Sequence, residues 1–239
     1  MSEASAADES SESTENDGVT RRRALVAGGA VGLAGLAGCT ALDVATGDPA
    51  EFTAGTATVA DATLSESGYE LNEVTEDTRT REFEAAGSTQ EVRVTSRVAE
   101  YDKAVEVLGE RYQAAVFAVL TTPRVEVLGQ AFNPVGDLSA DERAQLIVDR
   151  YEGVSDLERG SEYSTDVLGT DAGVVVYSAD GEIAGTGVSV ELEFHVAEAV
   201  EAGSDYVVPL AAYPAAFGDG ENVRRMLNGI EHDPASSDE

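Results

Sequence analysis

From about residue 56 onward, apolar and polar positions alternate with a period of two over several short stretches, which predicts β-strands. Val92, Val94 and Val98, for example, would lie on one face of such a strand. Residues 114–120 (AAVFAVL) are apolar on both faces, as expected of a central strand that is covered on both sides. The strands predicted in this way cover residues 74–84, 91–101, 114–120, 163–168, 174–177, 188–200 and 206–213, with residues 124–128 continuing the sheet and Asp180-Gly181 marking a turn.

Three stretches carry the signals of helices. Residues 59–66 precede Gly68, and glycine commonly ends helices, so we expect a short helix there. Residues 139–142 (SADE) form a capping box, in which Ser139 and Glu142 satisfy each other's backbone N–H groups, and the helix that it starts should end at Gly153. A third helix is predicted over residues 221–231, from an i, i+3, i+4, i+7 stripe made of Val223, Met226, Leu227 and Ile230.

Hairpins followed by a helix, further hairpins and a closing helix predict an α+β fold, with a largely antiparallel sheet flanked by helices. The chain shows neither an internal repeat nor a second linker, so we expect a single globular domain over residues 52–232 and a disordered tail over 233–239. The order of elements over about residues 88–232 resembles the PsbP-like α/β/α sandwich. This resemblance implies an architecture and assigns no functional residues.

The charge of the chain is strongly negative, with 46 acidic residues against 15 basic ones and a formal net charge of −31. Nucleic acids would be repelled by such a surface, and the absence of tryptophan leaves little for base stacking, so we expect no nucleic-acid partner. At molar salt the screening length falls to about 3 Å, and the repulsion between like charges nearly vanishes. The composition therefore indicates adaptation to a salt-rich habitat.

The most apolar stretch follows three arginines, Arg21 to Arg23, and runs without a charge over residues 24–38. These 15 residues would span about 22 Å as a helix, whereas a bilayer core is about 30 Å thick. Five glycines further weaken any helix in this stretch. A short apolar run with a basic flank is typical of an export signal, preceded here by an acidic extension that we expect to be disordered.

Two motifs in this leader resemble those of exported lipoproteins. The first, Arg22-Arg23-x-Leu25-Val26, resembles the twin-arginine export motif, and the second, Leu36-Ala37-Gly38-Cys39, resembles a lipobox. The resemblance implies cleavage before Cys39, the only cysteine of the chain, and a lipid on its thiol. Residues 1–38 would then be a signal peptide and residues 39–51 a tether that holds the domain on the extracellular side of the cell membrane. An uncleaved anchor and a buried cysteine are the alternatives.

Three further stretches extend the resemblance over most of the chain. Together with the leader they resemble uncharacterised haloarchaeal lipoproteins built around a domain of unknown function, a group that implies location and habitat but no activity. The stretches are residues 82–84 (EFE), 116–123 (VFAVLTTP) and 132–137 (FNPVGD).

The best candidate for a metal site is a strand face that carries Glu191, Glu193 and His195. Two carboxylates and an imidazole at alternate positions project to the same side, within about 7 Å along the strand, and these groups bind divalent cations. A solvated strand face is the alternative interpretation in a chain so rich in glutamate. The second histidine, His232, is expected in a frayed C-terminal end, and no serine lies in a nucleophile elbow, so we predict no catalytic residue and no cofactor.

A second candidate site is the loop over residues 132–137, where Phe132 and Asn133 are expected to shape a ligand-binding edge. The alternative is a structural loop that closes the end of the sheet with Phe132. Three functions are consistent with these features. The first is a non-enzymatic binding or accessory module, the second a metal-assisted hydrolase using Glu191, Glu193 and His195, and the third a structural component of the cell surface.

Overall fold

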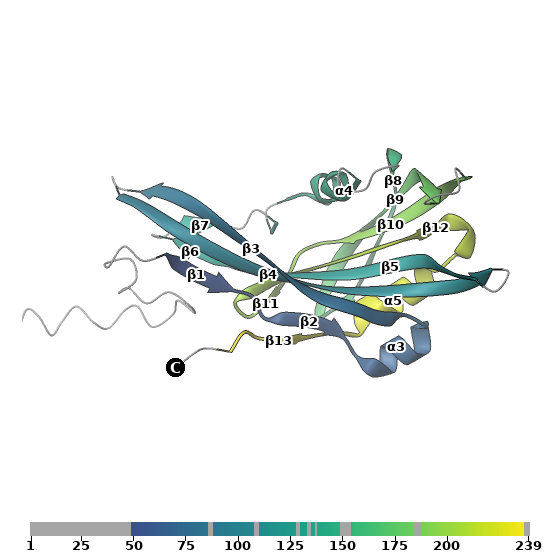
Figure 1. Cartoon of the computed structure of the whole chain (residues 1–239), viewed down its shortest axis with the longest axis horizontal. Coiled ribbons are helices and arrows are strands. Elements are labelled where there is room, and N and C mark those ends of the chain that lie inside the picture. The colour runs from purple at the N-terminus through teal and green to yellow at the C-terminus, as the bar shows by residue number, and fades with distance from the viewer. Residues whose placement is uncertain are drawn as a thin grey trace, which may run out of the picture. The chain divides into compact units, whose positions relative to one another are not determined.

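The computed structural model describes residues 49–85, 88–107, 110–127, 130–132, 135–136, 138–148, 154–183 and 188–236 (Figure 1). Over these residues the fold is α+β and mainly β, and all of them belong to one compact unit. The strands are β1 Ala50–Thr53, β2 Thr56–Val59, β3 Glu70–Ala85, β4 Ser88–Val107, β5 Glu110–Pro123, β6 Val125–Val127, β7 Gln130–Phe132, β8 Ser155–Val167, β9 Thr170–Ile183, β10 Val188–Ala197, β11 Val200–Ala202, β12 Asp205–Pro214 and β13 Ile230–Asp233. The helices are α3 Asp61–Ser67, α4 Ala140–Val148, α5 Gly220–Asn228 and a short 3-10 turn, η1 Ala215–Phe217.

The main sheet has nine strands, in the order β1-β4-β5-β12-β10-β9-β8, with β3 paired to β4 and β11 paired to β12. Its pairings are antiparallel except that of β1 with β4, so the prediction of a largely antiparallel sheet is confirmed. β4 carries β3 along one edge and shares its other edge between β1 and β5 (Figure 1). β3 and β8 therefore lie at the two sides of the sheet.

Each face of the sheet has its own core. On one face, apolar side chains of β4, β5, β9 and β12 pack against β2 and α5. The predicted stripe of α5 supplies Val223, Met226 and Leu227 to this core, all of them buried. On the other face, Tyr177, Phe194 and neighbouring apolar residues pack against Ala144 of α4. Helices thus cover both faces, as the sequence predicts.

Local signals place the helix ends where the sequence predicts them in two cases. Gly68 follows α3 in the left-handed conformation, with φ of 77°. The capping box before α4 is formed in both directions, since Ser139 N donates to Glu142 Oε2 (2.9 Å) and Glu142 N donates to Ser139 Oγ (3.3 Å). These ends are set by neighbouring residues alone, which is why the sequence is sufficient to find them.

The C-terminal helix is shorter than predicted. It ends at Asn228, and residues 230–233 form β13, which pairs with β2 in a separate two-stranded ribbon. Residues 230–233 leave the helix because they pair with β2. The residue between them and the helix is Gly229, where a Cβ atom would lie 2.3 Å from Thr63 Oγ1 of α3. Ile230 is buried as the stripe predicts, but from a strand rather than from a helix.

Several strand limits also differ from the prediction. Residues 125–127 pair only with β7 instead of continuing the main sheet. Asp180 and Gly181 lie inside β9 rather than in a turn, because both pair with β10, Asp180 with Glu191 and Gly181 with Val190. The first strand begins at Ala50, so two residues of the expected tether belong to the sheet. At the other end, Asp233 belongs to β13 rather than to a tail.

Candidate functional site

β10 brings two of the three predicted metal ligands together, in a buried cluster with tyrosines. His195 Nε2 lies 2.9 Å from Glu193 Oε1 and 2.9 Å from Tyr213 Oη of β12. Its other ring nitrogen, Nδ1, lies 2.8 Å from Tyr163 Oη of β8. Tyr213 also donates a short hydrogen bond to Glu193. Both nitrogens of the imidazole are therefore engaged by protein groups.

Burial controls the titration of this cluster. It lowers the pKa of His195 and outweighs the opposing effect of the Glu193 carboxylate. It also raises the pKa of Tyr163 to about 12, although the guanidinium of Arg224, 4.2 Å from the tyrosine ring centroid, acts in the opposite direction. The pKa of Tyr213 is raised by burial and by its hydrogen bond to Glu193. At neutral pH the histidine is therefore uncharged and the tyrosines remain protonated.

Glu191, the third predicted ligand, is exposed and does not join the cluster through any interaction with His195. Among the described residues, no group of three or more histidine, cysteine, aspartate or glutamate side chains is placed to hold a metal ion. The cluster also lies under the start of α5, where a Cβ atom on Gly220 would sit 3.1 Å from Tyr213 Oη. The arrangement is suited to tying β8, β10 and β12 to α5.

A cleft of about 660 Å³ lies on the opposite side of β8 and β9, under the first turn of α4. Its walls carry charges of both signs, together with the hydroxyl groups of two serines. The lining residues are Ser139, Ala140, Asp141 and Arg143 around the start of α4, Arg159, Glu162, Tyr163 and Ser164 of β8, Gly173, Val174 and Val175 of β9, and Glu198.

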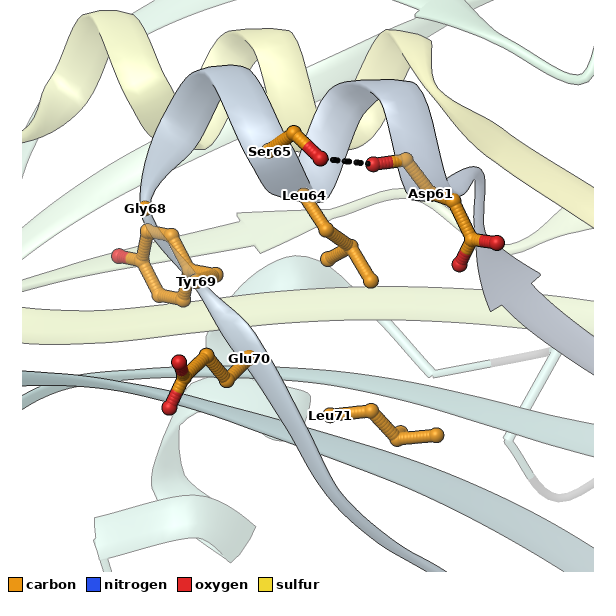
Figure 2. Close-up of a pocket in the computed structure, with 7 residues that line it drawn as sticks. All are labelled: Asp61, Leu64, Ser65, Gly68, Tyr69, Glu70 and Leu71. Carbon is orange, nitrogen blue, oxygen red and sulfur yellow. Dashed lines mark hydrogen bonds between the residues drawn. The ribbon is translucent and has the colours of Figure 1, made fainter.

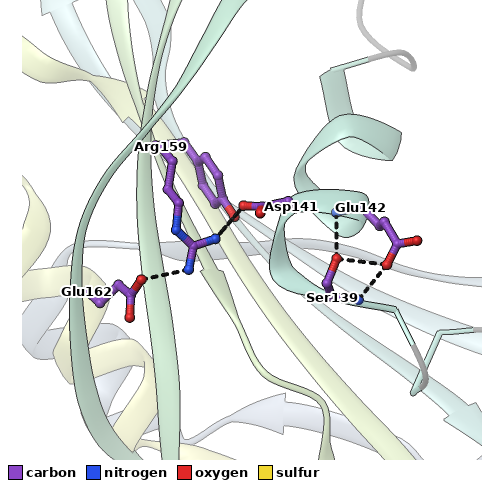
Figure 3. A network of polar contacts seen from close by, with 6 residues as sticks. Ser139, Asp141, Glu142, Arg159 and Glu162 are labelled. Atoms are coloured by element: carbon purple, nitrogen blue, oxygen red, sulfur yellow. Dashed lines mark hydrogen bonds and ion pairs between the residues drawn. The ribbon is translucent and has the colours of Figure 1, made fainter.

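Arg159 joins β8 to the start of α4 across this cleft. Figure 3 shows its guanidinium between two carboxylates, donating to Glu162 Oε1 (2.6 Å) on one side and to Asp141 on the other. Tyr177 Oη also donates to Asp141 Oδ1, at 2.5 Å. The hydrogen bonds from Tyr177 and Arg159 hold the pKa of Asp141 below its usual value, and burial raises the pKa of Tyr177 to about 12. The carboxylate is therefore ionised, and both donors bind its Oδ1.

Arg143 lies deeper in the same cleft, with only 7% of its surface exposed. Its Nη1 donates to the carbonyl oxygens of Val135 and Leu138 and so ties the preceding loop to α4. Its buried Nε has no partner among the residues that the structure describes. Burial lowers the pKa of Arg143, but a guanidinium remains charged throughout the physiological range. Glu198, whose Oε2 accepts a 3.1 Å hydrogen bond from Gly173 N, is the acidic group that counters this charge.

A family profile matches residues 56–231, and its description is a domain of unknown function. The chain belongs to the DUF6517 family. The match includes the cleft and the His195 cluster, which are therefore features of the DUF6517 part of the chain. No curated protein and no solved structure matches the chain.

The sequence did not predict a role for one buried aspartate of the DUF6517 domain. Asp205, at the start of β12, has none of its surface exposed, and its Oδ2 accepts hydrogen bonds from Gly55 N (2.9 Å) and His232 Nε2 (2.8 Å). Its Oδ1 has no partner among the described residues. His232 is therefore held in β13, and the prediction of a frayed end there is wrong. The only sequence signal was an isolated aspartate at the head of an apolar strand.

A shallower pocket of the DUF6517 domain lies beside α3 (Figure 2). It is lined by Asp61, Leu64, Ser65 and residues 68–71. Tyr69, whose side chain is buried, donates a 2.9 Å hydrogen bond to Asp219, which also accepts from Lys103 Nζ at 2.6 Å. These contacts join β3 and β4 to the start of α5, and the pocket has fewer polar groups than the cleft.

The remaining predicted site residues lie at the end of a described segment or outside the described residues. Phe132 ends β7 and pairs with Val125, while Asn133 lies outside the described residues. Cys39, both motif arginines, Leu25, Val26 and the three lipobox residues also lie outside them. None of the helices in the described part of the chain combines the length and apolarity needed to cross a bilayer.

Proposed function

We propose that the protein is a non-enzymatic binding module that is anchored in the cell membrane by a lipid on Cys39 and acts on the extracellular side. The cleft between α4 and the sheet is the observation that carries the binding role, because it is a polar hollow of about 660 Å³ with groups of both charges. The twin-arginine and lipobox motifs support the location. The acidic composition supports a salt-rich environment and, with the resemblance to haloarchaeal lipoproteins, the halophilic character.

Binding fits the cleft better than catalysis does. Asp141 Oδ1 accepts hydrogen bonds from Arg159 and Tyr177, and these hold the pKa of Asp141 below its usual value. A general acid or base works best with a pKa near the working pH, and this shift moves the pKa of Asp141 away from it. The two arginines and the acids instead suit a small ligand that carries both a negative and a positive group, as free amino acids do. The PsbP-like arrangement of the sheet and helices belongs to this proposal as well.

The anchor is tested by mass spectrometry of the protein purified from membranes. We expect a mature chain that begins at Cys39, with a lipid mass on that residue. Cys39→Ser should release the domain from membranes or leave the precursor uncleaved, because the acceptor thiol is missing. A bare thiol at position 39, or residues upstream of it still attached, would contradict the anchor without affecting the binding role.

The binding role is tested by calorimetric titration with a panel of free amino acids at molar salt. We expect saturable binding of at least one member, weakened about tenfold by Glu198→Gln, since a hydrogen bond to a charged group contributes about this much. Glu191→Gln, at an exposed position of β10 outside the lining of the cleft, is the matched control and should leave the affinity unchanged. If no amino acid binds, or if both variants lose affinity equally, the proposal that this cleft binds free amino acids is refuted.

A further inference from the structure

β3 is a long edge strand whose outer side pairs with no other described strand. It pairs with β4 along Glu70–Ala85, and no main-chain hydrogen bond outside the strands involves residues 71–82. Residues 71–82 are exposed, including two of the four large exposed apolar side chains of the described residues, Leu71 (48%) and Val74 (43%). Figure 1 shows β3 running along one side of the sheet. Such an edge is a template for a further strand.

The usual protections of an edge are absent from most of this strand. It contains no proline, and its single register shift lies near its start, between Leu71 and Glu73. Regular pairing with β4 continues from Glu73 to Ala85. The edge is still protected by charged side chains, but these side chains carry charges of both signs. Acidic side chains precede Thr78, and two of the chain's 15 basic residues, Arg79 and Arg81, follow it.

The charges along β3 are complementary to those of a second, antiparallel copy of the same strand. Two identical antiparallel strands in one sheet are related by a two-fold axis perpendicular to the sheet, so paired residues point to the same face and their numbers share a parity. With the axis at Thr78, each Asp77 lies opposite Arg79 of the other copy. The flanking pairs are Glu76 with Thr80, Thr75 with Arg81 and Val74 with Glu82. No pair in this register combines like charges, and opposite charges across strands are stabilising.

The neighbouring registers are disfavoured, because each of them places like charges opposite each other. An axis at Asp77 or Arg79 would place that residue opposite its own copy, and an axis at Thr80 would pair Arg79 with Arg81. Of all centres from Thr75 to Glu82, Thr78 alone avoids like-charge pairs. A centre at Val74 would bring the irregular segment at Asn72 into the ladder. Charge complementarity therefore selects one register.

We propose that two copies of this chain associate through β3, antiparallel and centred on Thr78, to form one continuous sheet. This interface is separate from the cleft and does not depend on the anchor. Its affinity comes from main-chain hydrogen bonds along residues 74–82, and its register from the two Asp77–Arg79 pairs. Within each copy Arg79 Nε already lies 2.7 Å from Asp77 Oδ2, so both side chains are placed on the shared face.

The register is tested by disulfide cross-linking of the full chain in a Cys39→Ser background, with one new cysteine in each variant. Thr78→Cys places two thiols directly opposite each other, at a separation that a disulfide spans. Thr75→Cys is the matched control, because the same residue type lies opposite Arg81 and about 20 Å along the strand from its own copy. We expect the Thr78→Cys dimer to form at least about tenfold faster. Equal rates, or no dimer with either variant, would overturn the proposal.

The charge pairs are tested by light scattering and sedimentation at the lowest salt at which the fold persists. Arg79→Asp opposes two aspartates across the axis and should weaken the dimer about tenfold. Asp77→Arg should do the same with two arginines, whereas the double variant Asp77→Arg/Arg79→Asp restores complementarity and should restore the dimer. Circular dichroism of each variant checks its fold. A monomeric unmodified chain at every concentration, or a double variant as weak as the single ones, would contradict the interface.

Discussion

Tyr213 and Tyr177 make the same contact on opposite faces of one sheet, and their surroundings differ. Both side chains are buried, and both hydroxyl groups donate to a carboxylate, Glu193 in one case and Asp141 in the other. Glu193 is partly buried and shares its oxygen with His195, whereas Asp141 is 63% exposed and shares its oxygen with the exposed Arg159. One arrangement lies beneath α5 and the other at the rim of the cleft under α4.

This difference indicates which of the two regions stabilises the fold and which remains available to a ligand. In the interior, a missing partner leaves a buried polar group unpaired, which costs more than the hydrogen bond itself contributed. At the rim, water replaces a missing partner at little cost, and exposed ion pairs add little stability. The cluster under α5 should therefore be sensitive to substitution, while the groups around the cleft should tolerate it.

Asp205 is the most deeply buried of these polar groups, and its substitution should cause the largest loss of stability. Asp205→Ala removes the acceptor of both Gly55 N and His232 Nε2 in a fully buried place, and we expect a loss of about 3–5 kcal/mol in the free energy of unfolding. Chemical denaturation at molar salt measures it. Asp233→Ala, an exposed aspartate next to His232, is the control and should change the stability by less than about 0.5 kcal/mol.

The two tyrosines test the comparison directly. Tyr213→Phe removes the hydroxyl that donates to Glu193 and also contacts His195 Nε2, and we expect a loss of about 1–3 kcal/mol. Tyr177→Phe removes the same atom beside a solvated carboxylate and should cost about 0.5–1.5 kcal/mol. Both changes delete one hydroxyl group, so their denaturation curves can be compared without correction for volume. Equal losses of stability would mean that a hydroxyl group contributes as much at the rim of the cleft as in the interior.

The titration of His195 should make the contribution of the buried cluster to stability depend on pH. Because burial lowers the pKa of His195 in the folded state, the unfolded chain binds more protons below about pH 6.5. Stability should therefore fall as the pH drops through this value toward the folded pKa, by at most about 1.4 kcal/mol per pH unit. His195→Gln should flatten this part of the profile. An unchanged slope in that variant would assign the pH dependence to other groups.

The smallest effect is expected at Arg159. Arg159→Ala removes exposed ion pairs with Asp141 and Glu162 and should shift the melting temperature by no more than about 2–3 °C at molar salt. Thermal denaturation followed by circular dichroism gives this shift. A loss as large as that of Tyr213→Phe would show that the rim of the cleft contributes to the fold as much as the interior does.

The sequence predicted those parts of the fold that depend on neighbours in the chain. Ser139 and Glu142 are three residues apart and cap α4 as expected, and the apolar stripe of α5 is buried as its spacing indicates. The alternation of residues in β4 and the apolar run in β5 likewise identified central strands. Their lengths were underestimated, because main-chain pairing continues beyond the apolar positions into polar residues, such as Asp102 and Lys103 of β4 and Thr121 of β5.

The parts that the sequence could not predict depend on contacts between distant segments. Asp205 is joined to Gly55 across 150 positions, and no pattern near either residue announces this contact. Residues 230–233 leave the helix because they pair with β2 near the other end of the described chain, whereas the spacing of Ile230 alone continues the helical stripe. The cleft was missed for the same reason, since Ser139, Arg159 and Glu198 meet only after α4 has packed on the sheet.

The ribbon formed by β2 and β13 has a consequence for the order of events during synthesis. Thr56 pairs with Asp233 and Val59 with Ile230, so strands from the two ends of the described chain lie side by side. While the ribosome still holds residue 233, β2 has no partner in this ribbon, and the hydrogen bond from His232 to Asp205 cannot form. The ribbon can therefore form only after residues 230–233 have emerged from the ribosome, and a chain that stalls before residue 230 would leave β2 without this partner and open to proteases and chaperones.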